Sequence, residues 1–206
     1  KWEDAALVEP FAIGSHCTGR GRVVEDDVVF ILGTGTIGSI ILQTCKAKGC
    51  KTVICCDISD SSLERAKEYG ADYVINSKTQ DVVAEIQKIT DGHGCTVAFD
   101  SACFPGSLTM CLQPGILCNA GRMVPMGFCT EKEGITQAMI NQRELDIIGS
   151  RMSQDAFEPT IARMEKGEYI TEGIATTFIK FSEIDKVFHL MDHPDESAKK
   201  MVILFD

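Results

Sequence analysis

Two absences from the sequence exclude several kinds of protein. No apolar stretch approaches the ~20 residues that a helix needs to span a bilayer, and the first residues, Lys-Trp-Glu-Asp, lack the pattern of a secretory signal. Basic clusters are missing as well. With 30 acidic against 20 basic residues, the net charge of -10 would repel a nucleic-acid backbone or an anionic membrane. We therefore expect a cytoplasmic protein that binds neither nucleic acid nor membrane.

The sequence also lacks cysteine pairs at the spacing of metal or redox motifs. Its ten cysteines are scattered, and none forms Cys-x-x-Cys. Cys45, Cys55 and Cys56 fall inside predicted helix or strand, where a reduced thiol behaves as a small apolar residue. His189 and His193 lie four apart on a predicted helix but have no third ligand by motif. We expect reduced cysteines in the core and no zinc bound by this chain alone.

Apolar strands and amphipathic helices alternate along most of the sequence. This pattern builds a parallel sheet that is covered by helices on both faces. The helices are predicted to include one that Thr79 opens and one whose first turn holds Pro105, whereas residues 113–121 fit no element. The predicted strands are residues 28–32, 52–56, 73–75, 96–99, 123–126 and 145–148. The sequence thus predicts an α/β fold with a doubly wound, six-stranded parallel sheet over about residues 20–150.

The first predicted strand runs directly into the glycine-rich segment 33–38, Gly-Thr-Gly-Thr-Ile-Gly. A G-x-G-x-x-G match alone is weak, but this one follows an apolar strand and opens an amphipathic helix. Gly33 permits the tight turn, Gly35 removes a side chain that would block a pyrophosphate, and Gly38 lets the helix lie close on the sheet. The anion would rest on the amides around Thr36 and Ile37, at the positive end of the helix. This context favours a dinucleotide site over a turn without a ligand.

Asp57 ends the second predicted strand, 19 residues beyond Gly38. A carboxylate at this place can accept hydrogen bonds from both hydroxyls of an adenosine ribose. A 2′-phosphate would meet a like charge there, and residues 58–60, Ile-Ser-Asp, supply no arginine to compensate it. The sequence therefore predicts NAD as the cofactor. The alternative is an acid at a strand end that starts an Asx turn.

Two other classes of protein share part of this pattern. An S-adenosylmethionine methyltransferase also has a glycine-rich first turn and an acid after its second strand, although its turn usually lacks the third glycine. A non-catalytic NAD-sensing module would share every feature described so far. Only residues beyond the nucleotide site separate it from an enzyme.

Five segments together resemble the medium-chain zinc-type alcohol dehydrogenases, and the resemblance covers nearly the whole chain. They are GTGTIG at 33–38, Asp57-Ile-Ser, Gly70-Ala-Asp-Tyr-Val-Ile-Asn, Asp91-Gly-His-Gly-Cys and Glu144-Leu-Asp-Ile-Ile-Gly-Ser-Arg. A finer likeness is to the sorbitol and threonine dehydrogenase branch, and within it to bacterial sugar-acid oxidoreductases such as L-galactonate 5-dehydrogenase and starvation-sensing dehydrogenase homologues. It is carried by Asp100-Ser-Ala-Cys-Phe-Pro, Met126-Gly-Phe and Gly149-Ser-Arg-Met.

The resemblance implies an NAD-dependent enzyme that oxidises a secondary alcohol of a polyol or sugar acid. In such enzymes a catalytic zinc polarises the alcohol while hydride passes to the nicotinamide. Its Cys and His-Glu ligands belong to an upstream, GroES-like catalytic domain that this sequence lacks, and the family's four-cysteine zinc lobe is absent too. The implied partners are a small-molecule substrate and further copies of the chain, as a dimer or tetramer.

Several residues take roles only through this resemblance. Glu9, in Leu7-Val-Glu-Pro, matches a helix whose Glu reaches the zinc or its water in the full-length protein; the alternative is an exposed acid at a helix end. The implied cofactor contacts, besides the turn and Asp57, are Ile58, Ser101, Met126, Gly127, Phe128, Ser150 and Arg151. Arg151 could equally be a surface arginine. The chain departs from the family at Ser62, where an Arg is frequent, and at Ala102-Cys103, where Thr-Gly is frequent.

The same resemblance divides the chain into three parts. Residues 1–20 are expected to be a linking helix from the catalytic domain, 20–150 the NAD-binding Rossmann domain, and 151–206 a helix and a C-terminal segment that returns to the catalytic domain. The chain is then the cofactor-binding half of a longer protein and inactive alone. Without the upstream domain, apolar side chains such as Leu7, Phe11, Val202 and Leu204 are expected to be exposed.

Overall fold

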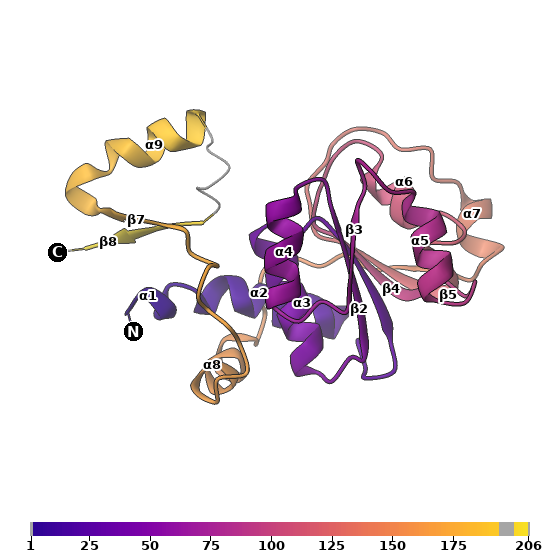
Figure 1. The fold of residues 1–206 in the computed structure, drawn as a ribbon, viewed down its shortest axis with the longest axis horizontal. Helices are drawn as coiled ribbons and strands as arrows, with labels where there is room; N and C mark the ends of the chain where they lie inside the picture. Colours follow the sequence, from indigo (N-terminus) through magenta and orange to yellow (C-terminus); the bar gives the residue numbers. More distant parts are fainter. Residues whose placement is uncertain (1, 194–199, 206) are drawn as a thin grey trace.

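A computed structural model describes residues 2–193 and 200–205, and a six-stranded parallel sheet lies at its centre (Figure 1). The strand order is β3-β2-β1-β4-β5-β6, and every neighbouring pair is parallel. The order reverses beside β1, as in a doubly wound sheet. The strands are β1 Val28–Leu32, β2 Thr52–Asp57, β3 Tyr73–Asn76, β4 Cys95–Asp100, β5 Leu117–Pro125 and β6 Asp146–Ile147. The predicted fold class is confirmed.

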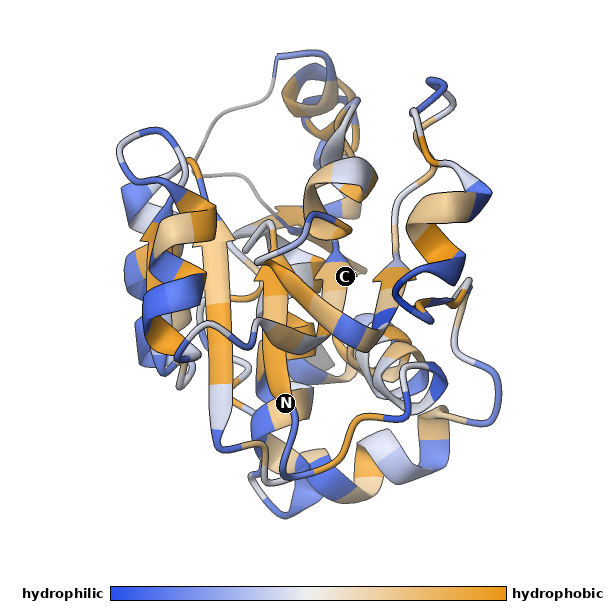
Figure 2. Ribbon diagram, turned by 90° about the vertical axis from the view of Figure 1, so that its right-hand side faces the viewer, coloured by the Kyte–Doolittle hydropathy of each residue, from blue (hydrophilic) through white to orange (hydrophobic). Residues whose placement is uncertain are grey.

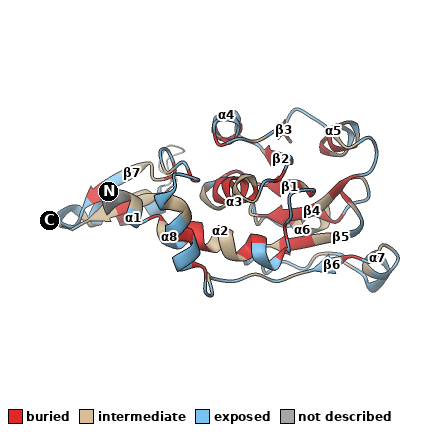
Figure 3. Ribbon diagram, turned by 90° about the horizontal axis from the view of Figure 1, so that it is seen from below, coloured by how far each residue is buried: buried red, intermediate tan, exposed pale blue. Residues whose placement is uncertain are grey.

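Helices cover both faces of the sheet (Figures 1 and 3). One face carries α2 Val8–Arg20, α3 Thr36–Ala47 and α4 Asp60–Glu68, and the other carries α5 Val82–Ile89 and α6 Ser107–Cys111. The short helices α1 Trp2–Ala5 and α7 Gln137–Asn141 lie before α2 and before β6 in the chain. In the described part of the chain, no helix combines the length and apolar character needed to cross a membrane.

The core forms two layers because successive strand residues point to opposite faces. On β1, Val29 and Ile31 pack with α2 and α3, whereas Phe30 and Leu32 pack with the layer under α5 and α6. Both layers need apolar partners, so β1 is apolar along its whole length and β2 is apolar between its two end residues (Figure 2).

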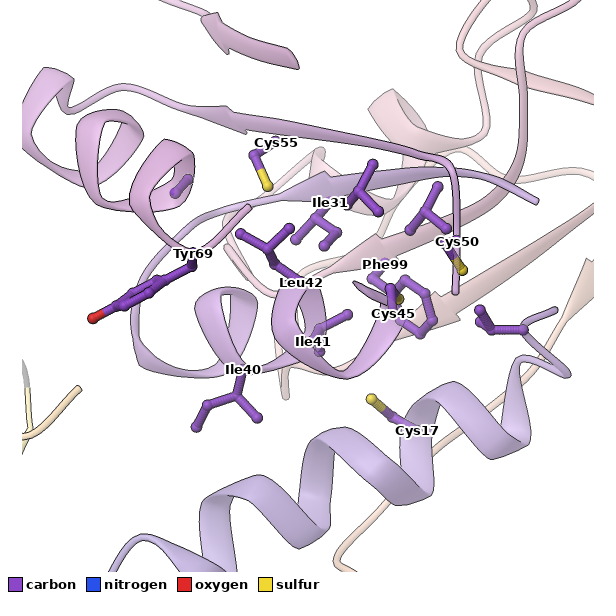
Figure 4. Packing of buried hydrophobic residues seen from close by; sticks show 14 of the residues in the cluster. Cys17, Ile31, Ile40, Ile41, Leu42, Cys45, Cys50, Cys55, Tyr69 and Phe99 are labelled. Atoms are coloured by element: carbon purple, nitrogen blue, oxygen red, sulfur yellow. The ribbon is translucent and has the colours of Figure 1, made fainter. Parts of the chain in front are cut away.

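Cysteines occupy much of this core (Figure 4). All ten are free thiols, and seven are buried, as the sequence led us to expect. Burial raises the pKa of Cys17 from 9.0 to about 12, because a thiolate would have to leave water. Burial likewise raises the pKa of Cys45, Cys55 and Cys95, so these thiols and Cys17 remain protonated and act as small apolar side chains. Cys50 differs, because its hydrogen bond with Cys45 lowers the pKa of its thiol.

Three predicted boundaries were wrong, each because of local hydrogen bonding or backbone geometry. Helix α5 begins at Val82 rather than Thr79, because the Asp81 carboxylate accepts a hydrogen bond from the Ala84 amide at 3.1 Å and caps the helix. Helix α6 begins at Ser107, two residues after Pro105, because Gly106 between them has a φ of +96° and lies outside the helical conformation. Strand β5 begins at Leu117, within a segment that the sequence left unassigned, and its register with β4 shifts between Cys95 and Val97.

The C-terminal elements stand beside the main sheet. Helix α8 Phe157–Glu165 contacts α2, and the strands β7 Thr177–Lys180 and β8 Met201–Leu204 pair in parallel as a separate sheet. The 3₁₀ helix Phe181–Glu183 and α9 Asp185–Asp192 follow β7 (Figure 1). As predicted, the last strands do not continue the parallel series.

Apolar side chains at the two ends of the chain are more buried than expected. Leu7, Phe11 and Val202 are all buried, and the Phe11 ring stacks on Tyr169 with 4.6 Å between the centroids. Leu204 is half-buried. The expected exposure was wrong for the first three. Leu7 and Phe11 are covered because they share one core cluster with Tyr169 of the C-terminal part.

Candidate functional site

The carboxyl ends of the six parallel strands gather at one edge of the sheet. Gly33 follows β1, Asp57 ends β2, Ser101 follows β4 and Met126 follows β5. The Ser101 amide donates to the Leu32 carbonyl at 2.9 Å, which joins β1 to β4 where the strand order reverses. A crevice that binds ligands is expected at this place in a doubly wound sheet. The fold thus brings the predicted site residues of four strands together.

Two of the three motif glycines are required by the turn itself. Gly33 has a φ of +86°, and a Cβ built there would lie 2.8 Å from the Ala102 amide nitrogen. A Cβ on Gly38 would overlap the Gly33 carbonyl oxygen. A side chain at Gly33 would therefore collide with the segment after β4, and one at Gly38 would disrupt the approach of α3 to the turn.

Gly35 differs from its neighbours in the turn. It is exposed, its φ is -64°, and a Cβ built on it would have no protein atom within 4 Å. The packing of the described protein therefore places no limit on a side chain at this position. A Cβ would instead project into the open space beside the turn, here called the cradle, where a bound phosphate would need the room.

The N-terminus of α3 faces this cradle. Gly35 is the N-cap residue and provides no side-chain cap for the first amides of the helix. Thr36 and Ile37 form its first turn, and Ile37 packs against the core. A helix of 12 residues presents partial positive charge at this end, so the turn is suited to an anion.

Asp57 is half-buried and joins the glycine turn to the end of β2. Its Oδ2 accepts hydrogen bonds from the Thr34 amide at 2.7 Å and the Thr34 hydroxyl at 2.9 Å. Its Oδ1 accepts from the amides of Ile58 at 2.7 Å and Ser59 at 2.9 Å, which forms an Asx turn. The Asx-turn alternative is thus present in the structure, and it holds the carboxylate beside the glycine turn. The Ile58 side chain is 57% exposed.

Ser101 supports the turn from β4. Its hydroxyl lies 2.7 Å from the Gly33 carbonyl and 3.0 Å from the Leu32 carbonyl, to which it donates. Next to it, Cys103 has a φ of +53°, a conformation that glycine adopts more easily. The departure from the family's Thr-Gly therefore places a side chain on a strained backbone.

The loops after β5 and β6 meet at the same edge. Met126 donates its amide to the Asp100 carbonyl at 2.9 Å, and Gly127 packs so closely on Cys103 that a Cβ there would overlap the thiol. Phe128 is 76% exposed, and the Arg151 guanidinium carbon lies 5.9 Å from the centre of its ring. Beside Arg151, the Ser150 hydroxyl oxygen is buried without a hydrogen-bond partner. These loops form a second group of polar and aromatic side chains at the carboxyl edge.

Sequence reasoning missed Arg65 of α4. The residue lies eight positions beyond Asp57, outside residues 58–60, in which no arginine occurs. In the fold it lines a small hollow together with Thr34, Gly35 and Thr36 of the turn. Helical spacing gave a signal, because the aromatic residue Tyr69 lies four residues after Arg65 and therefore on the same face of the predicted helix.

Metal-ligating side chains do not gather in the described part of the chain. No group of three His, Cys, Asp or Glu residues that could hold a metal ion occurs among the described residues. Glu9 lies exposed in the first turn of α2. The rings of His189 and His193 are 4.8 Å apart in an edge-to-face arrangement, and both residues are exposed. A single carboxylate such as Glu9 could hold zinc only with ligands from outside the described residues.

Comparison with known proteins gives a consistent result. The family model described as zinc-binding dehydrogenase matches residues 36–166. Over 203 residues, 98% of the chain, the sequence is 34% identical to starvation-sensing protein RspB of Escherichia coli K12 and 29% identical to sorbitol dehydrogenase of Bacillus subtilis. The crystal structure of an alcohol dehydrogenase (rspB) from E. coli CFT073, complexed with NADH, matches 98% of the chain with a TM-score of 0.89 and 31% identity.

The matched region is only part of each relative. The chain spans 58% of the length of RspB, 57% of the B. subtilis sorbitol dehydrogenase and 59% of the crystallised chain. The likeness therefore covers one portion of these longer proteins.

Proposed function

The chain belongs to the family of zinc-binding dehydrogenases, and from this premise we propose that it binds NAD at the carboxyl edge of its sheet as the cofactor-binding domain of a polyol or sugar-acid dehydrogenase. Family membership removes the methyltransferase alternative. It also favours an enzyme over an NAD-sensing module.

The observation that carries the proposal is the contrast among the three motif glycines. Gly33 and Gly38 are required by the packing of the turn, whereas a Cβ on Gly35 would meet no protein atom. A dinucleotide supplies the reason for glycine at this position, because its pyrophosphate must approach the backbone amides closely.

The ribose would bind at Asp57. Each of the four hydrogen bonds that this carboxylate accepts comes from a backbone amide or from the Thr34 hydroxyl. A ribose hydroxyl can take the place of the Thr34 hydroxyl as donor without breaking a bond to the backbone, because the hydroxyl hydrogen of Thr34 can turn toward another acceptor. A 2′-phosphate would have to approach the negative carboxylate, so the site favours NAD over NADP.

Calorimetric titration with both cofactors tests this preference. We expect the wild-type chain to bind NAD at least ~10-fold more tightly than NADP. A repulsion between like charges that would shift a pKa by about one unit corresponds to a tenfold change in affinity. Asp57→Ser should weaken NAD binding and narrow the difference. Equal or tighter binding of NADP by the wild type would show that the ribose argument is wrong, and S-adenosylmethionine serves as the ligand expected not to bind.

The nicotinamide would lie near the second group of side chains, formed by Met126, Gly127, Phe128, Ser150 and Arg151. The exposed Phe128 ring and the buried Ser150 hydroxyl, which has no partner, are available to a ring and a carboxamide at this edge. When bound, the nicotinamide supplies the acceptor for hydride from the substrate alcohol. The residues of this chain would orient the ring and limit the access of water.

Zinc chemistry would belong to the complete enzyme. We propose that Glu9 reaches the catalytic zinc or its bound water there, together with ligands from a GroES-like domain to which residues 151–206 return. In a protein that contains both domains, Glu9→Gln should reduce the zinc content or turnover by ~10- to 100-fold with little effect on NAD affinity. If zinc content and turnover are unchanged, Glu9 is only an acid at a helix end.

The wider biology follows from the same proposal. The substrate class is a secondary alcohol of a small polyol or sugar acid, in keeping with the names of several relatives such as sorbitol dehydrogenase and (R,R)-butanediol dehydrogenase. A cytoplasmic dimer or tetramer is the expected state. The isolated chain is expected to bind cofactor without oxidising alcohols.

A further inference from the structure

Arg65 presents a buried cationic group beside the glycine turn. The residue as a whole is half-buried, but its Nη2 is buried and has no hydrogen-bond partner. A charged donor left without a partner away from water costs free energy, and arginine is rarely buried unless it is paired. The orphaned Nη2 therefore leaves a charged donor available to a partner that is not part of the described protein.

The surroundings of Arg65 show where that partner would lie. It lines one hollow with Thr34, Gly35, Thr36 and Ser39, which belong to the turn and the first turns of α3. Tyr69, Gly173 and Ile174 complete the lining. The hollow holds about 10 Å³, room for roughly one oxygen atom. It flanks the same turn whose amides face the cradle.

Two acceptors on residues that line the hollow already accept other hydrogen bonds. The Thr34 carbonyl accepts from the Ser39 hydroxyl at 3.0 Å, and the Gly35 carbonyl accepts from the Ser39 amide at 2.9 Å. The Glu172 carbonyl accepts from the Tyr69 hydroxyl at 2.9 Å. An anionic oxygen from a ligand would supply the missing acceptor without disturbing these bonds.

We propose that Arg65 binds the pyrophosphate of the dinucleotide, with Nη2 donating to an anionic oxygen beside Gly35 and Thr36. The assignment rests on the proposed NAD site. It concerns the pyrophosphate rather than a 2′-phosphate, because the hollow is lined by the turn and not by Asp57 or the residues directly after it. A guanidinium suits phosphate oxygens, and its charge adds to the partial charge of the α3 N-terminus.

Three ligands separate this role from the alternatives: ADP-ribose, 2′-phospho-ADP-ribose and adenosine. They differ in whether they carry the pyrophosphate and the 2′-phosphate. Binding of the first two is measured by calorimetry, and that of adenosine by NMR titration. Arg65→Gln should weaken the binding of ADP-ribose and of 2′-phospho-ADP-ribose by the same factor, about 10- to 100-fold, as expected for the loss of a charge-assisted hydrogen bond. Adenosine binding should not change.

Two further variants act as controls. Lys67→Gln removes an exposed charge from the same helix, one that pairs with Glu64 at 2.8 Å, and should leave all three affinities unchanged. Arg65→Lys keeps the charge but loses the planar fork, so its loss of affinity for ADP-ribose should be smaller than that of Arg65→Gln. If Arg65→Gln does not fold, the wild type is compared with Arg65→Lys instead. An Arg65→Lys variant that binds ADP-ribose as tightly as the wild type would then overturn the proposal.

The other outcomes are also decisive. Unchanged ADP-ribose affinity in Arg65→Gln, a loss confined to 2′-phospho-ADP-ribose, or an equal loss for adenosine would each overturn the assignment to the pyrophosphate. A wild-type chain that binds none of these ligands would instead contradict the proposed NAD site itself.

Discussion

Gly35 and Gly38 stand three residues apart in one turn and have different physical reasons to be glycine. A methyl group on Gly38 would overlap the Gly33 carbonyl, so the turn or the start of α3 must move. A methyl group on Gly35 would meet no protein atom within 4 Å, and its φ of -64° is open to alanine. A substitution of Gly38 should therefore lower the stability of the protein, whereas a substitution of Gly35 should lower its affinity for the ligand.

Alanine at each position tests that separation. The free energy of unfolding of Gly35→Ala should lie within about 0.5 kcal/mol of the wild-type value, as for most surface substitutions, but its affinity for NAD should fall at least ~10-fold. Gly38→Ala should lose stability by ~1 to 3 kcal/mol or more, because overpacking strains the structure. Thermal melts and NAD titrations measure both effects. Unimpaired NAD binding by a stable Gly35→Ala would contradict the pyrophosphate cradle.

The residues of the site differ in how far the sequence could predict them. The glycines and Asp57 belong to a local pattern whose spacing has a mechanical cause, so the fold places them together as expected. Arg65 belongs to no such pattern. Its approach to the turn depends on the packing of α4 beside α3 and on the segment around Gly173, which is far away in sequence. A tertiary contact of this kind is not encoded in a motif.

At the level of elements, a buried ion pair connects the middle of β5 with the amino ends of β1 and β4. Arg122 on β5 pairs with Asp27, just before β1, and their side chains are 15% and 5% exposed. Asp27 also accepts hydrogen bonds from the Thr96 hydroxyl of β4 at 2.7 Å and from the Val24 amide at 2.8 Å. This network lies at the edge of the sheet opposite to the proposed cofactor site.

Breaking the pair should destabilise the sheet without changing the cofactor site. Arg122→Met leaves the Asp27 carboxylate buried without its cation, so the free energy of unfolding should fall by about 3 to 5 kcal/mol. The double variant Asp27→Asn with Arg122→Met should recover part of that loss. Urea denaturation measures both, and NAD affinity should stay near the wild-type value. If the free energy of unfolding of Arg122→Met falls by less than about 1 kcal/mol, the ion pair contributes little to stability.

Strand β5, which carries Arg122, was predicted poorly because its first half is irregular. Strands β1 and β2 read clearly as apolar runs because both of their faces are covered. The first half of β5 contains exposed Asn119 and Ala120, and Ala120 has a φ of +55° at the shift in register with β4. An irregular strand of this kind lacks the apolar run by which buried strands are recognised.

At the scale of the whole molecule, the chain combines a complete sheet with a smaller pair of strands. The sheet, its two helical layers and the separate character of β7 and β8 were all predicted, since each follows from the alternation of elements. The burial of Leu7 and Phe11 was not, because it depends on Tyr169 and other residues more than 100 positions away. The exposed side chains of Phe188 and Met191 on α9 are instead the apolar surface that a further domain or another copy could cover.

The central claim is that a dinucleotide binds at the carboxyl edge of the sheet, and a map of amide chemical shifts during a titration with NAD tests it directly. The account predicts that the amides of residues 34–38, 57–59 and 126–128 shift and saturate together at one NAD per chain. The amides around His93 and Asn119, which line a hollow at the opposite edge, should not move. Shifts centred on that opposite hollow, or no saturable shifts at the glycine turn, would contradict the account.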